Sequence, residues 1–262
     1  MRIALFTLES LSNAEAVRRF MTEGEHEIVL LGLSDPYRPS AGGAVGQIVR
    51  HLRRSGPRFL PYLAVNFTLP ALVGGVRGRG LGRLARRLGI PVETVREVNG
   101  EALRDRLRQS GAELILSFHF DQIFDAATLA GVPRGGINVH PSLLPRHRGP
   151  VPAFYALMDQ PRATGVTIHR LAPRIDAGAI LAQAPVTLAP DVSAIAAAAT
   201  LHEAALPLLG SVLRQLQAGE TVEHSPELLP YCPFPAPALL REAARRGVRL
   251  AGSRDFHRAF FR

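Results

Sequence analysis

The sequence of 262 residues contains no lysine, no tryptophan and a single cysteine, Cys232. One cysteine excludes an internal disulfide, and no spacing of Cys and His typical of a zinc site accompanies it. No uninterrupted apolar run reaches the roughly 18 residues of a membrane-spanning helix. The first residues also lack the apolar core and small-residue cleavage site of a secretory signal. These absences favour a cytoplasmic globular protein.

The basic charge is concentrated in one segment. All 31 basic residues are arginines, and the net charge is +9. Residues 36–92 contain ten arginines and no Asp or Glu, so this segment carries +10 and the other 205 residues carry −1. Clustered arginines bind polyphosphates, which leaves an arginine-rich nucleic-acid-binding protein as an alternative. No motif of a nucleic-acid-binding fold accompanies the arginines and aromatic residues are few, which disfavours a nucleic-acid partner.

An apolar stretch lies in the middle of this basic segment. Residues 59–73 are strongly apolar, and arginines flank them on both sides, at Arg50, Arg53, Arg54, Arg58, Arg77 and Arg79. We expect residues 36–89 to be an insertion, because long connections in compact domains are usually functional or disordered. One interpretation is a helical hairpin that packs on the body or on a second subunit of a homodimer. The other is a lid or surface element that contacts a lipid-linked acceptor or a membrane surface.

Strands and helices alternate along the first 150 residues. This alternation predicts a Rossmann-like, open, mostly parallel α/β sheet with helices on both faces. Beyond residue 150 the pattern changes to a helix, two strands and a long Ala-rich helix. We therefore predict a catalytic domain over 1–220 and a C-terminal extension over 221–262 that packs on it, with an extended stretch over 225–237. The predicted strands are 2–7, 27–33, 90–92, 113–118, 136–140, 165–171 and 179–188, and the predicted helices are 13–23, 100–109, 125–130, 151–158 and 193–217.

The first chemical motif lies at the end of a predicted strand and continues to Gly149. Asn138 and His140 are two residues apart, so their side chains leave the same face of the sheet. In an open α/β sheet, ligands bind beyond the carboxyl ends of the strands. An amide and an imidazole there can donate to one oxygen and form an oxyanion hole.

The second motif is Asp176-Ala-Gly178, in a loop. A carboxylate that faces an imidazole can orient it and pass protons through a bound water. The sequence has no G-x-S-x-G motif to present a nucleophile. Together the two motifs suit direct attack of an amine on an activated acyl group, without an acyl-enzyme.

The combination N-x-H-x-S-L-L-P-x-x-x-G, followed 38 residues after its Asn by D-x-G, resembles the folate-dependent formyltransferase family. That family includes the glycinamide ribonucleotide, methionyl-tRNA and amino-sugar formyltransferases, and the resemblance covers about residues 112–215. It implies that Asn138 and His140 hold the formyl oxygen as it becomes an oxyanion. It also implies that Asp176 keeps His140 charged and helps to remove the proton of the amine.

The resemblance further implies 10-formyltetrahydrofolate as the formyl donor and no metal. The loop 117–124 departs from the usual family sequence, but it occupies the place where the folate is expected. Backbone groups of this loop and of residues 171–175 are expected to hydrogen-bond the pterin, and the expected folate contacts are Phe118, His119, Phe120, Asp121, Ile123, Leu171, Arg174 and Ile175. The loop after the catalytic strand is expected to meet the acceptor through Ser142, Arg146, Arg148 and Gly149.

Two departures from the family narrow the acceptor. The segment 8–13 has no glycine and carries Glu9, which disfavours the phosphate of glycinamide ribonucleotide. About 45 residues follow the last predicted helix, too few for the C-terminal β-barrel that helps methionyl-tRNA formyltransferases to grip tRNA. We therefore expect a small amine acceptor, such as an amino sugar on a nucleotide or lipid carrier. A formyltetrahydrofolate hydrolase and a methionyl-tRNA formyltransferase-like enzyme are the alternatives, although such hydrolases usually carry an N-terminal regulatory domain.

Overall fold

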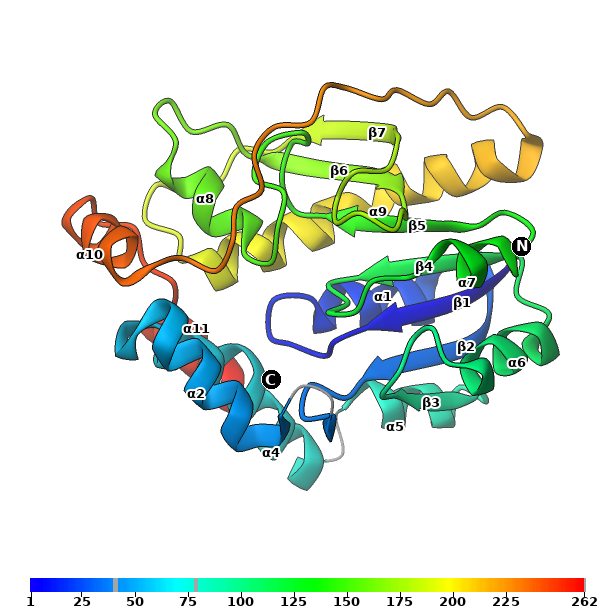
Figure 1. The fold of residues 1–262 in the computed structure, drawn as a ribbon, viewed down its shortest axis with the longest axis horizontal. Helices are drawn as coiled ribbons and strands as arrows, with labels where there is room; N and C mark the ends of the chain where they lie inside the picture. Colours follow the sequence, from blue (N-terminus) through cyan, green and yellow to red (C-terminus); the bar gives the residue numbers. More distant parts are fainter. Residues whose placement is uncertain (40–41, 78–79, 262) are drawn as a thin grey trace.

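A computed structural model describes residues 1–39, 42–77 and 80–261, and in these ranges the chain forms one seven-stranded sheet covered by helices (Figure 1). The strand order is β3-β2-β1-β4-β5-β6-β7. The first five strands in this order pair in parallel, whereas β6 is antiparallel to both of its neighbours. The strands are β1 (Arg2–Thr7), β2 (Glu27–Ser34), β3 (Val92–Val95), β4 (Leu114–Phe118), β5 (Gly136–His140), β6 (Gly165–Arg170) and β7 (Ile180–Pro185).

The edge strand β3 starts later than the predicted strand at 90–92. Its pairing with β2 begins at Val92 and runs to Val95. Pro91 has no N–H to donate, although its carbonyl accepts from the N–H of Leu31 at 2.8 Å. A proline at this point therefore marks the start of the strand and not its middle.

Helices cover both faces of the sheet, which confirms the predicted fold class. On one face, α1 (Ala14–Glu23), α5 (Leu81–Arg87) and α9 (Ala194–Ala218) pack on a core that includes Ile3, Leu5 and Phe118. On the other face, α6 (Glu101–Ser110) and α7 (Ala126–Ala130) pack over Ala4, Phe6 and Ile115. Alternate residues of β1 and β4 thus face opposite cores, as a strand buried on both sides requires.

The helix α9 is the one helix in the described ranges that is long and apolar enough to cross a membrane, with a mean hydropathy of 1.4. Its C-terminal half packs against the sheet through Ala205, Leu209 and Leu213. Its N-terminal half contributes Ile195 and Leu201 to a second core. Buried contacts along its whole length make α9 a core helix of this fold.

The segment predicted as an insertion forms a series of short helices and not a simple hairpin. These are α2 (Gly43–Ser55), the 3₁₀ helix η2 (Pro57–Phe59), α3 (Leu60–Leu63), the π-helical turn η3 (Ala64–Thr68) and α4 (Leu69–Arg77), which precede α5. Arg79 lies outside the described residues, as does the side chain of Arg77.

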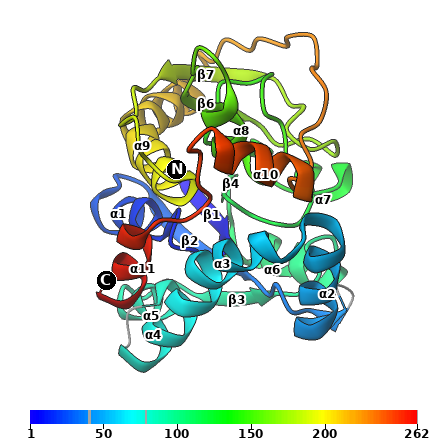
Figure 2. The same ribbon diagram turned by 90° about the vertical axis from the view of Figure 1, so that its left-hand side faces the viewer.

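The C-terminal extension contains two helices that the sequence patterns did not predict, α10 (Pro237–Arg245) and α11 (Ser253–Phe261). The stretch 225–236 before them is extended, as predicted. Phe59, Tyr62 and Val65 from the insertion share the second core with Leu240 and Ala243 from α10. Figure 2 shows this end of the molecule, where the insertion and the extension lie side by side.

Candidate active site

A cavity of about 300 Å³ opens beyond the carboxyl ends of β4 and β5. Asn138 and His140 line it from β5, and Asp176 reaches it from the loop between β6 and β7. The three residues singled out by the sequence motifs therefore meet in one place, at the edge of the sheet where an α/β fold binds its ligands.

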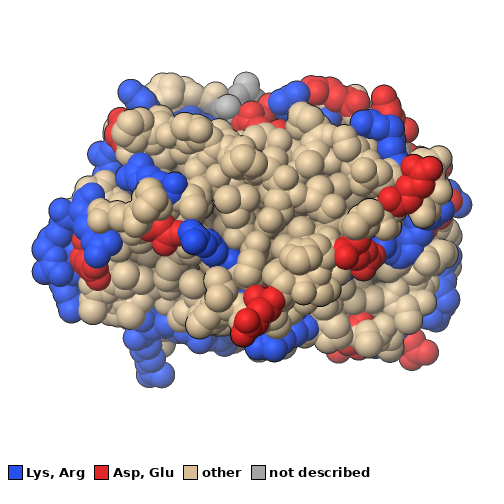
Figure 3. All heavy atoms as spheres, turned by 90° about the horizontal axis from the view of Figure 1, so that it is seen from above, with Lys and Arg blue, Asp and Glu red and all other residues tan. Residues whose placement is uncertain are grey.

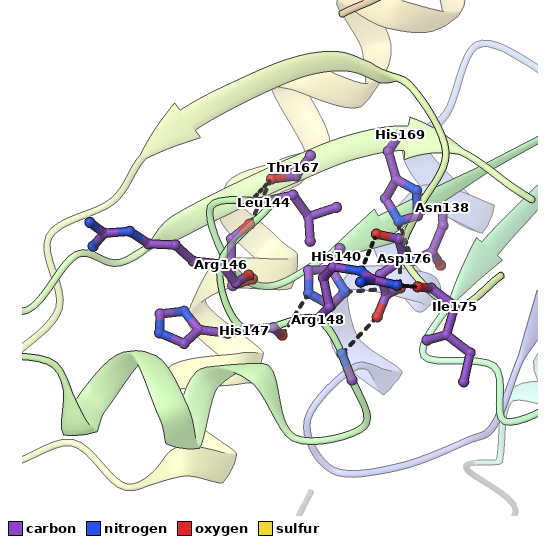
Figure 4. A network of polar contacts seen from close by, with 12 residues as sticks. Asn138, His140, Leu144, Arg146, His147, Arg148, Thr167, His169, Ile175 and Asp176 are labelled. Carbon is purple, nitrogen blue, oxygen red and sulfur yellow. Dashed lines mark hydrogen bonds and ion pairs between the residues drawn. The ribbon is translucent and has the colours of Figure 1, made fainter. Parts of the chain in front are cut away.

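The imidazole of His140 lies between two oxygen atoms (Figure 4). Its Nδ1 is 3.5 Å from Asp176 Oδ1, and its Nε2 is 3.3 Å from the carbonyl oxygen of His147. Both oxygens are acceptors, so only the doubly protonated ring can donate to both. This setting suits a charged imidazole that stabilises negative charge and later gives up a proton.

A second histidine, His169, fixes the amide of Asn138. The two residues are opposite one another in the antiparallel pair of β5 and β6. Nδ1 of His169 lies 2.8 Å from the carbonyl oxygen of Arg170, so this nitrogen carries the hydrogen. Burial lowers the pKa of His169 to about 4, which leaves the ring neutral with a lone pair on Nε2. Nε2 therefore accepts from the Asn138 amide nitrogen at 3.1 Å, and the second N–H of that amide remains for the cavity.

Asp176 is held by its own loop and by the loop after β5. Its backbone has φ +47°, and its Oδ2 accepts from the N–H of Gly149 at 2.8 Å. Arg148 donates to the carbonyl oxygens of Asp176 at 3.0 Å, of Ile175 at 2.5 Å and of Leu229 at 3.0 Å. Gly178 permits the close return of the chain, because a Cβ there would lie 1.9 Å from the Arg170 carbonyl oxygen. These contacts place the carboxylate before any ligand binds.

One end of the cavity contains most of the positions expected to contact folate. Six of the eight line it, namely His119, Phe120, Asp121, Ile123, Leu171 and Ile175. Phe118 does not, because the alternation of β4 turns its side chain into the core under α1 and α9, where it is fully buried. Arg174 does not either, and its side chain is exposed to solvent. Neither side chain faces the cavity, and the expected backbone contacts of these two positions with the folate stay a prediction.

Asp121 is held at this end by residues from other elements. It accepts a short hydrogen bond from the hydroxyl of Ser34, and Arg38 pairs with its other oxygen at 2.9 Å. Phe120 stacks on Phe124, with the ring centroids 5.5 Å apart. The result is a flat apolar wall with a fixed carboxylate beside it.

The expected acceptor contacts are mostly internal to their loop. Gly149 lines the cavity, but Ser142, Arg146 and Arg148 do not. The hydroxyl of Ser142 is buried and donates to the carbonyl oxygen of Arg146 at 3.0 Å, and the Arg146 side chain lies 3.7 Å from Asp159. Arg148 is buried, and its guanidinium donates to the carbonyl oxygens of Asp176, Ile175 and Leu229. Ser142 and Arg148 are thus taken up by contacts inside the protein, whereas the Arg146 side chain is exposed and its contact with the acceptor stays a prediction.

The opposite wall of the cavity was not predicted. Its lining residues come from the β1–α1 loop, the insertion, α9 and the extended tail, and they are Ser12, Tyr62, Ala198, His202, Tyr231 and Phe234, with His119 beside them. No motif joins these residues, because they lie in separate segments that only the second core brings together. In the described part of the chain no arginine lines this cavity, and Asp121 and Asp176 are the acidic side chains in its lining.

His202, beside this space, has a buried ring nitrogen without a hydrogen-bond partner among the described residues. Its Nδ1 lies 2.8 Å from the carbonyl oxygen of Ala198 and 3.0 Å from that of Ser12, so Nδ1 carries the hydrogen. Burial, together with nearby His119, lowers the pKa of His202 to about 3. Its Nε2 is therefore a lone-pair acceptor, and it has no hydrogen-bond partner among the described residues although His202 lines the cavity.

The amino end of α1, which could bind an anion, is closed by the protein. The N–H of Ser10 donates to Asn13 Oδ1 at 3.0 Å, and the N–H groups of Leu11 and Ser12 donate to the backbone and side-chain oxygens of Asn66 at 2.8 and 3.0 Å. Glu9 turns away from the cavity and accepts from the N–H of Leu81 at the start of α5 at 3.0 Å. The sequence suggested that Glu9 would repel a phosphate at this position. In the structure Asn66 instead accepts from the N–H groups that a phosphate would need.

The catalytic cluster also has a composition that metals can use. One ligand atom each from His140, His169 and Asp176 lie within 4.8 Å of one another. Two imidazoles and a carboxylate are a known zinc ligand set. In this cluster, however, the His169 Nε2 lone pair already accepts from Asn138.

Comparison with known proteins identifies the fold and the motif region. Residues 85–213, close to half of the chain, match the family model described as Formyl transferase. Residues 85–213 carry a formyltransferase domain. The matched residues include all three catalytic positions, β4 to β7 and most of α9. The protein is therefore an enzyme that transfers formyl groups.

Solved formyltransferase structures share this fold at low identity. Glycinamide ribonucleotide transformylase 1 from Symbiobacterium toebii superposes with a TM-score of 0.57 at 20% identity, over 84% of this chain and 88% of its own. The phosphoribosylglycinamide formyltransferase of Anaplasma phagocytophilum gives 0.58 at 19% identity, over 90% and 99%. A sugar N-formyltransferase from a Shewanella species gives 0.54 at 18% identity and covers 99% of this chain and 86% of its own. The superpositions extend the likeness in fold beyond the matched motif region.

Proposed function

We propose that this formyltransferase moves the formyl group of 10-formyltetrahydrofolate to the amine of an amino sugar carried on a nucleotide or a lipid. The observation that carries the proposal is the position of Asn138, His140 and Asp176 at the middle of a cavity with two different ends. One end has the flat wall of Phe120 and Phe124, which suits a pterin ring. The other has aromatic side chains and neutral imidazoles, which suit a sugar.

The reaction follows from the groups at the centre. The amine nitrogen attacks the formyl carbon, a C–N bond forms, and the carbonyl electrons move to the oxygen. The free N–H of Asn138 donates to that oxyanion, and the Nε2 N–H of His140 leaves the His147 carbonyl oxygen, 3.3 Å away, to donate to it as well. Asp176 takes the proton of the attacking amine through a bound water. The bond to N10 of the folate then breaks, and His140 supplies the proton that N10 needs to leave.

The acceptor wall favours a sugar over a small phosphorylated amine. Asn66 occupies the amino end of α1, and arginine is missing from the described cavity lining, so neither usual means of holding a phosphate is present inside. His202 Nε2 can accept from a hydroxyl or amine of the acceptor. Arg54 lies outside this wall, with its guanidinium 5.8 Å from the centre of the Phe234 ring. A phosphate attached to the sugar would thus meet cations only at the rim.

A direct test is to incubate the enzyme with 10-formyltetrahydrofolate and a panel of UDP- and dTDP-linked amino sugars, and to detect formylated products by mass spectrometry. We expect at least one sugar to gain a formyl group at its free amine. Glycinamide ribonucleotide, included as a phosphorylated amine, should give no product. Release of formate at the same rate with and without amines would instead identify a formyltetrahydrofolate hydrolase and contradict the proposal.

A further inference from the structure

The helix α2 carries an apolar stripe that nothing in the described chain covers. Of its thirteen residues, one, Ser55, is buried. Val45, Ile48, Val49 and Leu52 are exposed, with 75%, 48%, 39% and 36% of their surfaces in solvent. Residues at i, i+3, i+4 and i+7 lie on the same side of a helix. Such a contiguous apolar side on a surface helix marks a contact surface.

Arginines border this stripe. At about 100° per residue, Arg53 lies next to Val49 at the edge of the stripe and Arg50 lies further round the helix, while Arg54 lies toward the side that contacts Phe234. The three arginines line one surface hollow with Gly46 and Val49. The insertion contains no acidic residue to oppose them. A hollow with three guanidinium groups and an apolar floor fits a phosphate that is attached to an apolar chain.

Neighbouring elements continue the basic surface. The helix α10, with exposed Arg241 and Arg245, lies beside α2 at the same end of the molecule (Figures 1 and 2). Seen from above, basic side chains crowd the end that carries α10, on the left of Figure 3, while most acidic side chains lie toward the other end. This uneven distribution of charge favours an anionic partner at the end of the molecule that carries α10.

The helix also borders the acceptor wall of the active site. The ring of His51 lies 4.9 Å from that of Phe234, and the Arg54 guanidinium lies over the same ring. Phe234 in turn lines the cavity. Anything bound along α2 is therefore one side chain away from the acceptor end of the active site.

We propose that α2 is a membrane-docking helix that binds an anionic lipid surface. Val45, Ile48, Val49 and Leu52 enter the boundary between headgroups and acyl chains, while Arg50, Arg53 and Arg54 bind lipid phosphates. This division of apolar and cationic sides is how interfacial helices hold a membrane. Nucleic acid would contact the arginines alone, so the apolar stripe favours a lipid surface as the partner. The docking itself does not depend on which amine the enzyme formylates.

The test is cosedimentation of the whole protein with phosphatidylcholine vesicles, with and without phosphatidylglycerol, at low and high salt. We expect binding to the anionic vesicles that weakens with salt. The triple change Arg50→Glu, Arg53→Glu and Arg54→Glu should lower partitioning at least about a hundredfold, since each basic residue near an anionic surface matters about fivefold. The double change Ile48→Ser and Leu52→Ser should weaken binding about tenfold and leave the salt dependence in place.

The matched control is the triple change Arg83→Glu, Arg86→Glu and Arg87→Glu, which alters the same number of exposed arginines on α5. It should retain most of the binding, and thermal melts should show that all variants are folded. No sedimentation with anionic vesicles at low salt would overturn the proposal, as would equal losses in the α2 and α5 variants. A wild-type dimer in analytical ultracentrifugation that Ile48→Ser and Leu52→Ser convert to a monomer, without change in vesicle binding, would assign the stripe to a second copy and overturn it too.

Discussion

The two walls of the active-site cavity are built in different ways. The catalytic wall is a continuous polar network in which Asn138, His140, His169 and Asp176 contact one another or the loop that carries Gly149. The acceptor wall is a set of rings and neutral groups from segments far apart in the chain. The first wall fixes reacting atoms and lies within the matched family region, whereas most of the second lies outside it. Chemistry and acceptor choice therefore reside in separable parts of this chain.

The largest effect should come from breaking the catalytic wall. We expect His140→Ala and Asp176→Asn each to lower turnover at least about a hundredfold, the usual scale of lost oxyanion or acid–base help. Affinity for the folate should change little, because neither change alters the wall formed by Phe120 and Phe124. Steady-state rates with the best amine of the panel, beside folate binding by calorimetry, measure both. Near-normal turnover in either variant would remove that residue from the mechanism.

Breaking the acceptor wall should change affinity more than rate. His202→Phe keeps a ring in place but removes the Nε2 lone pair, so the KM for the amine should rise about tenfold, as expected when a hydrogen bond to the substrate is lost. The KM for the folate should stay the same. His224→Phe changes an exposed histidine and is the matched control. If His202→Phe left the KM for the amine unchanged, this imidazole would be a structural group only.

Acid should destabilise the protein through histidines of both walls. His169 and His202 are buried and His119 is half-buried, and all three are neutral, with pKa values of about 4, about 3 and about 4. In the unfolded chain they titrate near 6.5, so unfolding binds up to three more protons as the pH falls from about 6.5 toward 4. The stability that is present above pH 6.5 should be lost at about 4 kcal/mol per pH unit near pH 5. Urea titrations between pH 7 and 5 measure this slope.

The same titrations isolate the contribution of His202. His202→Gln should reduce the slope by about a third, because one of the three extra protons is lost. His224→Gln, which changes an exposed imidazole, should leave it as in the parent protein. An unaltered slope in His202→Gln would mean that this histidine is already charged in the folded state.

The smallest expected effect is that of removing metals. Dialysis against a strong chelator should leave the rate unchanged, because the folate already activates the formyl group and Asn138 and His140 can hold the oxyanion. Added Zn²⁺ should inhibit, since it would compete for His140, His169 and Asp176, whose ligand atoms lie within 4.8 Å of one another. Loss of activity on dialysis that one particular metal restores would assign this cluster to a metal centre.

The sequence predicted the wall with Asn138, His140 and Asp176 but not the acceptor wall. Alternating strands and helices predicted the sheet, and the two motifs predicted that Asn138, His140 and Asp176 meet at one site, since strand geometry dictates which side chains share a face. The sequence did not show that strand alternation turns the Phe118 side chain into the core. It also did not show that the Arg148 guanidinium donates to backbone carbonyl oxygens and not to a ligand. His202 and Phe234 gave no signal, because an isolated residue acquires its role only when distant segments meet.

The second core also has a consequence for the order in which the molecule is assembled. Phe59, Tyr62 and Val65 rest on Leu240 and Ala243, about 180 residues further along the chain. Contacts of such long range form late, and a chain made from its N-terminus completes its early elements first. The sheet and its catalytic residues can thus come together on the ribosome while the pocket is still open on one side. On the proposed function, the acceptor side of the pocket is consequently the part of each newly made molecule that is completed last.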